Sequence, residues 1–196
     1  MRRLRLKSMA IVLAGLCLAW PAAAQVQVEN PPDPWIHTAT ETRFPATVGE
    51  FQRRQVFEYS PDGRDAGVNY FLRQGDDWAN VSLFVYPVIA DLDCRGTYED
   101  AKGDVTSYAG ARLMGESLVV APAGRGDPTA FHASYLMPGG AMRADLPELR
   151  SDVYLYCPPG NVWLVKYRAT STIGADFAAD IERLLHSIAW PAALGG

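Results

Sequence analysis

The chain has 196 residues, of which 20% are charged, and its formal net charge is −4. An acidic chain is a poor partner for nucleic acid or for anionic lipid, because both bind to basic surfaces. The sequence contains no internal repeat or low-complexity tract, and its length suits a single hydrophobic core.

Residues 1–24 have the pattern of a secretory signal peptide. Four basic residues open the chain, an uncharged apolar run follows over residues 9–20, and Ala22 and Ala24 form a signal-peptidase site. We expect cleavage before Gln25 and a periplasmic or secreted protein without stable membrane insertion. A retained anchor is the alternative, but the apolar run is short for a membrane span. Loss of the four basic residues changes the formal charge from −4 to −8.

The segment after the signal peptide, residues 25–44, is rich in proline and polar side chains. We expect an extended N-terminal arm that lies on the domain and is anchored by Trp35, and a flexible tail is the alternative. Residues 45–191 then form a single domain, and residues 192–196 form a tail.

Seven segments have the composition or the alternation of β-strands. Residues 54–60, 67–73 and 81–88 follow one another with short turns between them, which favours antiparallel neighbours. The run at 81–88 is apolar on both faces, as in a central strand that is covered on each side. Further strands are expected at 117–122, 130–137, 151–157 and 162–170, the last two joined as a hairpin.

Two segments have helical periodicity. Residues 97–110 place Tyr98, Ala101, Val105 and Tyr108 on one helical face, with Thr97 as the expected N-cap. Residues 174–191 carry an apolar stripe that starts at Phe177, and Pro191 ends the helix. The sequence therefore predicts an α+β domain: a largely antiparallel sheet of about six or seven strands with one inserted helix and one C-terminal helix.

This order of strands, helix, strands and final helix resembles the PsbP-like and DcrB-like group of exported or lumenal α+β proteins. The closing segment "DFAADIERLLHSIAWP" is similar to the terminal helix of such domains. The resemblance covers residues 45–191 and implies an accessory or binding role more than catalysis. It assigns no functional residue.

Two cysteines remain after signal removal, Cys94 and Cys157. Two cysteines in an exported chain most simply form one disulfide. A thiol nucleophile would need a base close in space, and a zinc site would need more ligands. We therefore predict a Cys94–Cys157 disulfide, with no metal and no other cofactor.

The segment "DLDCRGTYEDAK" at 91–102 begins like a calcium-binding loop. Asp91, Asp93 and Gly96 have the required offsets. However, Arg95 fills the fifth position and Lys102 fills the twelfth, where a bidentate Glu is required. We therefore interpret the segment as the solvated start of a helix.

The last predicted strand carries the best candidate for a ligand-binding site. Lys166 and Arg168 share one face of this strand, and Tyr154 and Tyr156 share a parity on the neighbouring strand. A basic pair flanked by tyrosines can hold an anionic small molecule or a carboxylate of a partner. Cross-strand ion pairing with ordinary aromatic packing is the alternative.

Two functions follow from these observations. We expect an exported, non-catalytic accessory or binding protein whose partner is an unknown envelope protein or a small anionic ligand, and not nucleic acid. The alternative is a small periplasmic hydrolase with an unrecognised site built from His132 or from the Lys166–Arg168 face, although the sequence contains none of the common hydrolase motifs.

Overall fold

The computed structural model describes residues 25–88, 90, 92–124, 126–160 and 162–194, so the predicted signal peptide lies outside the described residues. The strands and helices are β1 (Val26–Gln27), β2 (Trp35–His37), β3 (Thr42–Phe44), β4 (Thr47–Val48), β5 (Phe51–Glu58), β6 (Ala66–Gln74), β7 (Asp77–Pro87), α1 (Cys94–Thr106), β8 (Arg112–Val120), β9 (Pro128–Met137), β10 (Leu149–Tyr156), β11 (Trp163–Thr172), α2 (Ala178–Ser187) and the 3-10 helix η1 (Ala192–Leu194).

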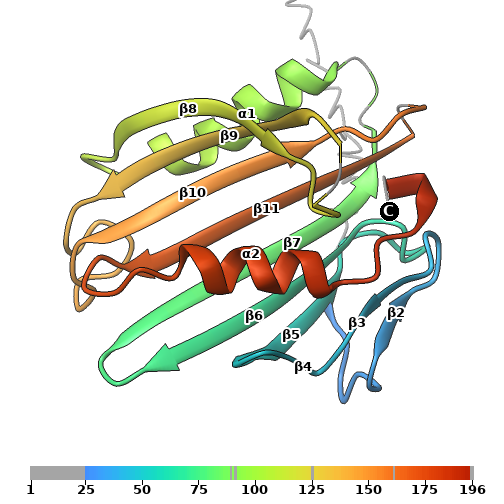
Figure 1. The fold of residues 1–196 in the computed structure, drawn as a ribbon, viewed down its shortest axis with the longest axis horizontal. Coiled ribbons are helices and arrows are strands. Elements are labelled where there is room, and N and C mark those ends of the chain that lie inside the picture. Colours follow the sequence, from blue (N-terminus) through green and yellow to red (C-terminus); the bar gives the residue numbers. More distant parts are fainter. Residues whose placement is uncertain (1–24, 89, 91, 125, 161, 195–196) are drawn as a thin grey trace, which may run out of the picture.

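One large antiparallel sheet dominates the fold (Figure 1). Its strand order is β1-β5-β6-β7-β11-β10-β9-β8, and β4 pairs with β5 to complete nine strands. Two hairpin-connected runs, β5-β6-β7 and β8-β9-β10-β11, meet where β11 pairs with β7. The centre of the sheet therefore joins parts of the chain that are about eighty residues apart in sequence, which short turns alone do not predict.

The predicted α+β class with six or seven strands was wrong. The fold is mostly β, with a nine-stranded sheet, a second sheet formed by β2 and β3, and only two α-helices among the described residues. The missed strands are β1 to β4, which are two or three residues long. Segments this short complete no more than one period of alternation, so sequence pattern does not reveal them.

The two faces of the sheet are covered by different elements. On one face, α2 packs through Leu184 and Leu185 against buried residues of β6, β7 and β11. On the opposite face, α1 packs through Tyr98 and Val105 against β9 and β10. Figure 1 looks onto the α2 face, and α1 lies behind β8 and β9. We call these the α2 face and the α1 face.

The α1 face is only partly covered. Helix α1 contacts β9 and β10, while the same face of β6 and β7 carries the half-buried side chains of Asn69, Asn80, Ser82 and Phe84. The Asn69 amide donates to Asn80 Oδ1 at 2.9 Å and to Ser82 Oγ at 3.1 Å. These polar side chains therefore bond to one another on a part of the face where α1 makes few contacts.

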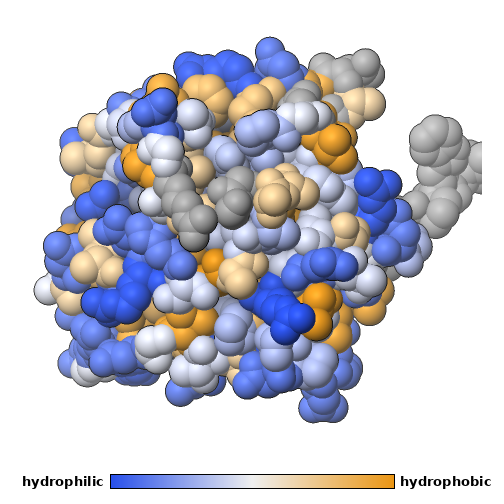
Figure 2. Space-filling model, turned by 45° about the vertical axis from the view of Figure 1, so that its right-hand side comes forward, coloured by the Kyte–Doolittle hydropathy of each residue, from blue (hydrophilic) through white to orange (hydrophobic). Residues whose placement is uncertain are grey.

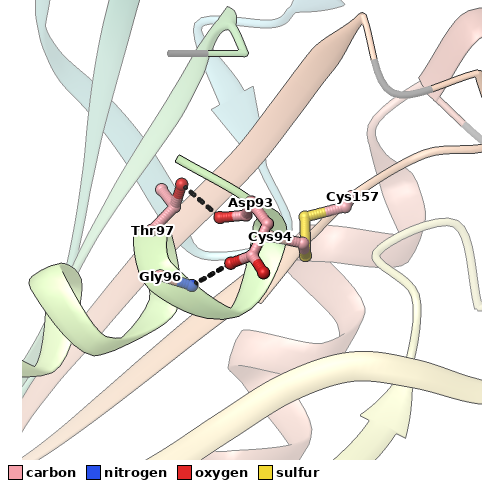
Figure 3. The surroundings of a disulfide bond; sticks show 5 residues. All are labelled: Asp93, Cys94, Gly96, Thr97 and Cys157. Atoms are coloured by element: carbon pink, nitrogen blue, oxygen red, sulfur yellow. Dashed lines mark hydrogen bonds between the residues drawn. A yellow bond between two sulfur atoms is a disulfide. The ribbon is translucent and has the colours of Figure 1, made fainter. Parts of the chain in front are cut away.

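The predicted disulfide is confirmed. Cys94, the first residue of α1, is bonded to Cys157, which directly follows β10, and their Cα atoms are 6.2 Å apart (Figure 3). The helix begins earlier than predicted, because its N-cap is Asp93, four residues before Thr97. The Asp93 carboxylate accepts from the Gly96 amide at 2.6 Å, and the Thr97 hydroxyl donates to the Asp93 carbonyl.

On the side drawn in Figure 2, apolar residues form small separate patches among hydrophilic ones. None of the helices in the described part of the chain combines the length and apolarity of a membrane span.

Candidate functional site

Lys166 and Arg168 lie side by side on the α1 face. Lys166 is aligned with Phe84 of β7 and Leu155 of β10, and Arg168 is aligned with Ser82 and Val153. Both side chains are half-buried. The structure therefore brings the predicted basic pair together at the centre of the sheet.

Tyr154 and Tyr156 lie on the opposite face. Tyr154 is aligned with Tyr167, and Tyr156 is aligned with Val165, all on the α2 face. Residues directly opposite each other in an antiparallel pair share a face of the sheet. Tyr154 and Tyr156 are opposite Tyr167 and Val165, which flank Lys166 in sequence and therefore point to the other face. The expected arrangement of two tyrosines around the basic pair is therefore not present.

Lys166 is compensated by groups of the protein itself. Its Nζ is 3.8 Å from Asp104 Oδ2, and it lies 4.9 Å from the centroid of the Phe84 ring. Lys166 and Asp104 line a cavity of about 390 Å³, and Asp65 and Asp100 also line it. Burial raises the pKa of Asp65, and the positive charge of Lys166 partly opposes this rise. Acidic and aromatic neighbours therefore already offset the positive charge of Lys166, so its attraction for an anion is weak.

Arg168 has a different environment. Its Nε donates to Ser151 Oγ at 2.9 Å, and its guanidinium lies 5.4 Å from the centroid of the Tyr108 ring. Its Nη2 atom is buried and has no hydrogen-bond partner among the described residues. A buried guanidinium donor without an acceptor is costly, so this group is the strongest indication of a bound ligand in the molecule.

Arg168 lines a cavity of about 500 Å³, which we call the arginine pocket. Its walls come from β6, β7, β11 and the loop between β9 and β10, and they consist of Phe71, Arg73, Trp78, Asn80, Ser82, Met142, Arg143, Leu146, Arg168 and Thr170. Three of these residues are arginines, and none carries a carboxylate. Volumes of this size are typical of small-molecule sites.

The other groups of the arginine pocket can contribute to anion binding in distinct ways. Arg73 uses its Nε to donate to the Gly75 carbonyl, and Arg143 pairs with the exposed Asp145. Both arginines are exposed and are free to turn toward a ligand. Trp78 and Phe71 are stacked with centroids 6.1 Å apart and provide an aromatic wall. Planar guanidinium groups bind carboxylate and phosphate with two parallel hydrogen bonds.

His132 lies in a second polar cluster, on the α2 face. Its Nε2 is 2.9 Å from Asp152 Oδ1, its Nδ1 is 3.2 Å from Ser117 Oγ, and its ring stacks on Tyr154. Ser117, His132 and Asp152 lie on the neighbouring strands β8, β9 and β10, respectively. They form a Ser-His-Asp row that the sequence analysis missed, because the alignment of Ser117 with His132 depends on the register of β8 against β9.

Asp152 is the buried acid of this row. Burial alone raises the pKa of Asp152, but hydrogen bonds from His132 and Arg150 outweigh it and hold this pKa below its ordinary value. Arg150 donates two hydrogen bonds to the carboxylate, of 2.7 Å and 3.1 Å. The acid is therefore held in its ionised form by two cationic or hydrogen-bonding neighbours.

The calcium-like segment does not form a metal site as far as the structure describes it. Asp93 is engaged as the N-cap of α1, and Asp91 lies outside the described residues. Across the described chain, no group of three or more His, Cys, Asp and Glu side chains has an arrangement that could hold a metal ion.

Comparison with known proteins gives no assignment of family. No protein-family model matches the chain, and no curated protein is significantly similar to it in sequence. The geometry of the arginine pocket and of the His132 cluster is therefore the basis for assigning a function.

Proposed function

We propose that this protein is an exported binding or accessory protein that holds a small anionic ligand in the arginine pocket. The ligand's carboxylate or phosphate group pairs with Arg168 at the base of the pocket, while Arg73 and Arg143 close over it from the rim. The stacked rings of Phe71 and Trp78 contact the remainder of the ligand. The arrangement binds and orients an anion.

The observation that carries this proposal is the unpaired, buried Nη2 of Arg168. In an acidic chain, three arginines line one cavity whose described lining has no carboxylate, and one of them, Arg143, is paired with the exposed Asp145. A ligand oxygen next to Nη2 would satisfy the donor and remove the cost of its burial. Lys166, which we predicted as a ligand-binding residue, is assigned a minor role because Asp104 and two aromatic rings already surround it.

The proposed location is the periplasm or the extracellular space. The disulfide supports it, since such bonds persist mainly in oxidising compartments. The signal-peptide pattern of residues 1–24 points the same way. The resemblance to PsbP-like and DcrB-like proteins stays a prediction, and the proposal does not depend on it.

The test is a calorimetric titration of the mature chain with inorganic phosphate, with sulfate, and with a panel of small dicarboxylates and sugar phosphates. We expect at least one anion to bind, and Arg168→Met to weaken it at least about tenfold, since a hydrogen-bonded charge pair is lost. Arg73→Met, which changes an exposed residue, should weaken the same anion less.

Two controls separate this effect from general changes in charge. Arg183 is an exposed arginine of α2, and Arg183→Met should leave the affinity unchanged. Lys166→Met should also have little effect. An anion that binds Arg168→Met and the unaltered chain equally would show that the arginine pocket is not its site.

The second candidate function is hydrolysis, and the Ser117–His132–Asp152 row is the observation in its favour. Ser117 is exposed, and a hydroxyl within hydrogen-bond reach of an imidazole can act as a nucleophile. Turnover of an esterase, phosphatase, peptidase or glycosidase substrate that disappears in both Ser117→Ala and His132→Ala would establish it. Turnover that survives both substitutions would assign the row a structural role.

A further inference from the structure

A third cavity lies on the α2 face, away from the arginine pocket. It has a volume of about 450 Å³ and opens between α2 and the turn that connects β8 to β9. It is lined by Val119, Val120, Ala121, Pro122, Pro128, Tyr154, Tyr167, Ala178, Ile181, Glu182, Leu185 and His186. We call it the tyrosine cavity. Apart from two tyrosines, one acid and one histidine, its lining is apolar, and its volume is within the usual range of ligand sites.

Two stacked tyrosines on neighbouring strands contribute the phenol groups of this cavity. The rings of Tyr154 and Tyr167 are nearly parallel, with centroids 4.2 Å apart, and Tyr167 is only 2% exposed. Neither hydroxyl has a hydrogen-bond partner among the described residues, although both side chains line the cavity. A tyrosine hydroxyl that lines an apolar cavity can donate a hydrogen bond to a ligand there.

The electrostatic setting restricts what such an acceptor can be. Burial raises the pKa of both tyrosines, and the nearby carboxylate of Glu182 raises it further for each of them. Both phenols therefore remain neutral donors at physiological pH. Among the described residues no lysine or arginine lines the cavity, and Glu182 disfavours a second negative charge there.

We propose that the tyrosine cavity binds an apolar small molecule whose single polar group is an uncharged carbonyl or hydroxyl oxygen. The oxygen accepts hydrogen bonds from Tyr154 and Tyr167 at the base of the cavity. The apolar body lies against Ile181 and Leu185 of α2 and against Val119 of β8. This site is on the other side of the sheet from the arginine pocket, and it does not depend on the function proposed for that pocket.

Displacement of the uncharged fluorescent dye Nile red from the mature chain tests this inference with a matched set of twelve-carbon compounds. Methyl decyl ketone and dodecanol should displace the dye at concentrations roughly two- to tenfold lower than dodecane, because their oxygen accepts hydrogen bonds from the two phenols. Dodecanoate should be a weaker competitor than the ketone, since its charge lies beside Glu182.

Two variants locate the site. Tyr167→Phe keeps the stacked ring but removes one of the two donors, so it should reduce the advantage of the ketone over dodecane. Ile181→Trp should fill the cavity and abolish Nile red binding. The matched controls are Tyr135→Phe, which removes an unpaired hydroxyl from the α1 face, and Arg183→Trp, which adds an indole to an exposed position of α2. Both should bind like the unaltered chain.

The proposal is wrong if dodecanoate competes as well as the ketone, if Tyr167→Phe leaves the preference for the ketone unchanged, or if Nile red still binds Ile181→Trp with full affinity. Since Ile181→Trp can also disturb the packing of α2, its unfolding transition is measured beside its dye binding. The Tyr167→Phe result stands without it, because that substitution retains the ring.

Discussion

At the residue scale, the Asp152 carboxylate shows how a buried charge is stabilised on this sheet. Its side chain is 8% exposed and is bonded to His132 and Arg150. Isolated burial of a carboxylate is strongly unfavourable, and paired burial becomes tolerable through the hydrogen bonds that the pair provides. Removing the charge therefore leaves two donors facing a weaker acceptor.

Asp152→Asn should lower the free energy of unfolding at neutral pH by about 1–3 kcal/mol, because the bonds to His132 and Arg150 are charge-assisted. The pKa of Asp152 is lower in the folded than in the unfolded chain, where it is about 3.9. Its stabilisation is therefore complete above that value and is lost as the pH falls through the folded-state pKa. The difference between the variant and the unaltered chain should shrink below about pH 4.

Urea denaturation at a series of pH values measures this difference. Asp145→Asn is the control, because Asp145 forms an exposed pair with Arg143 that solvent screens. A constant difference between Asp152→Asn and the unaltered chain over the whole range would show that ionisation of Asp152 does not contribute to stability.

Only part of the candidate site could be predicted from the sequence. The period of two along one strand is enough to place Lys166 and Arg168 on the same face. The relation of Tyr154 to these residues depends on strand register, and so does that of Ser117 to His132. A one-residue shift in register reverses which side chains meet. Clusters that span two or more strands could therefore not be predicted from the sequence, whereas pairs within one strand could.

At the scale of elements, α1 is fixed to the sheet by its first turn. The Cys94–Cys157 disulfide joins the helix to the end of β10, and Asp93 satisfies the amide of Gly96. The sequence predicted the disulfide from cysteine number and compartment, without geometry. It misplaced the helix start, since Asp93 and Thr97 are both good N-cap residues and only the path of the chain distinguishes them.

Replacing Cys94 and Cys157 together by alanine should lower the free energy of unfolding by about 2–4 kcal/mol, because the unfolded chain loses a cross-link. The loop closed by the disulfide has a sequence separation of 63 residues. Denaturation of the unaltered protein with and without a reductant gives the same comparison without mutation. Unreduced peptide mapping should recover the linked pair, and free labelling of both thiols in the native protein would contradict the disulfide.

The remaining errors in the fold concern short and exposed elements. The long buried strands β6, β7, β10 and β11 all overlap predicted segments, because their side chains alternate or are apolar throughout. Strand β8 begins five residues earlier than predicted, at Arg112, and eight of its nine residues are exposed. An exposed strand has no buried face to impose alternation, so its pattern is weak.

At the scale of the whole molecule, the sheet separates two kinds of cavity. The arginine pocket is on the α1 face, and the tyrosine cavity is on the α2 face. The sheet edges are also unequal. One edge is occupied by the short strands β1 and β4, while the other is the full length of β8, which carries four of the eight large exposed apolar residues. An apolar edge of this kind favours strand pairing at high concentration.

Export is the prediction that belongs to the molecule as a whole. We expect the mature chain to begin at Gln25, because Ala22 and Ala24 precede it in the form that signal peptidase accepts. Intact mass measurement of the protein from the envelope fraction checks this. A full-length chain recovered in the membrane pellet would instead indicate a retained anchor.

The position of the disulfide has a consequence for how damage to this protein would be detected. The turn between β8 and β9, residues 121–127, is within the segment that the disulfide closes. A protease that cuts the chain there leaves two fragments that remain covalently joined through sulfur. A cut molecule therefore migrates as one species on a gel without reductant, and only reduction separates it into two bands.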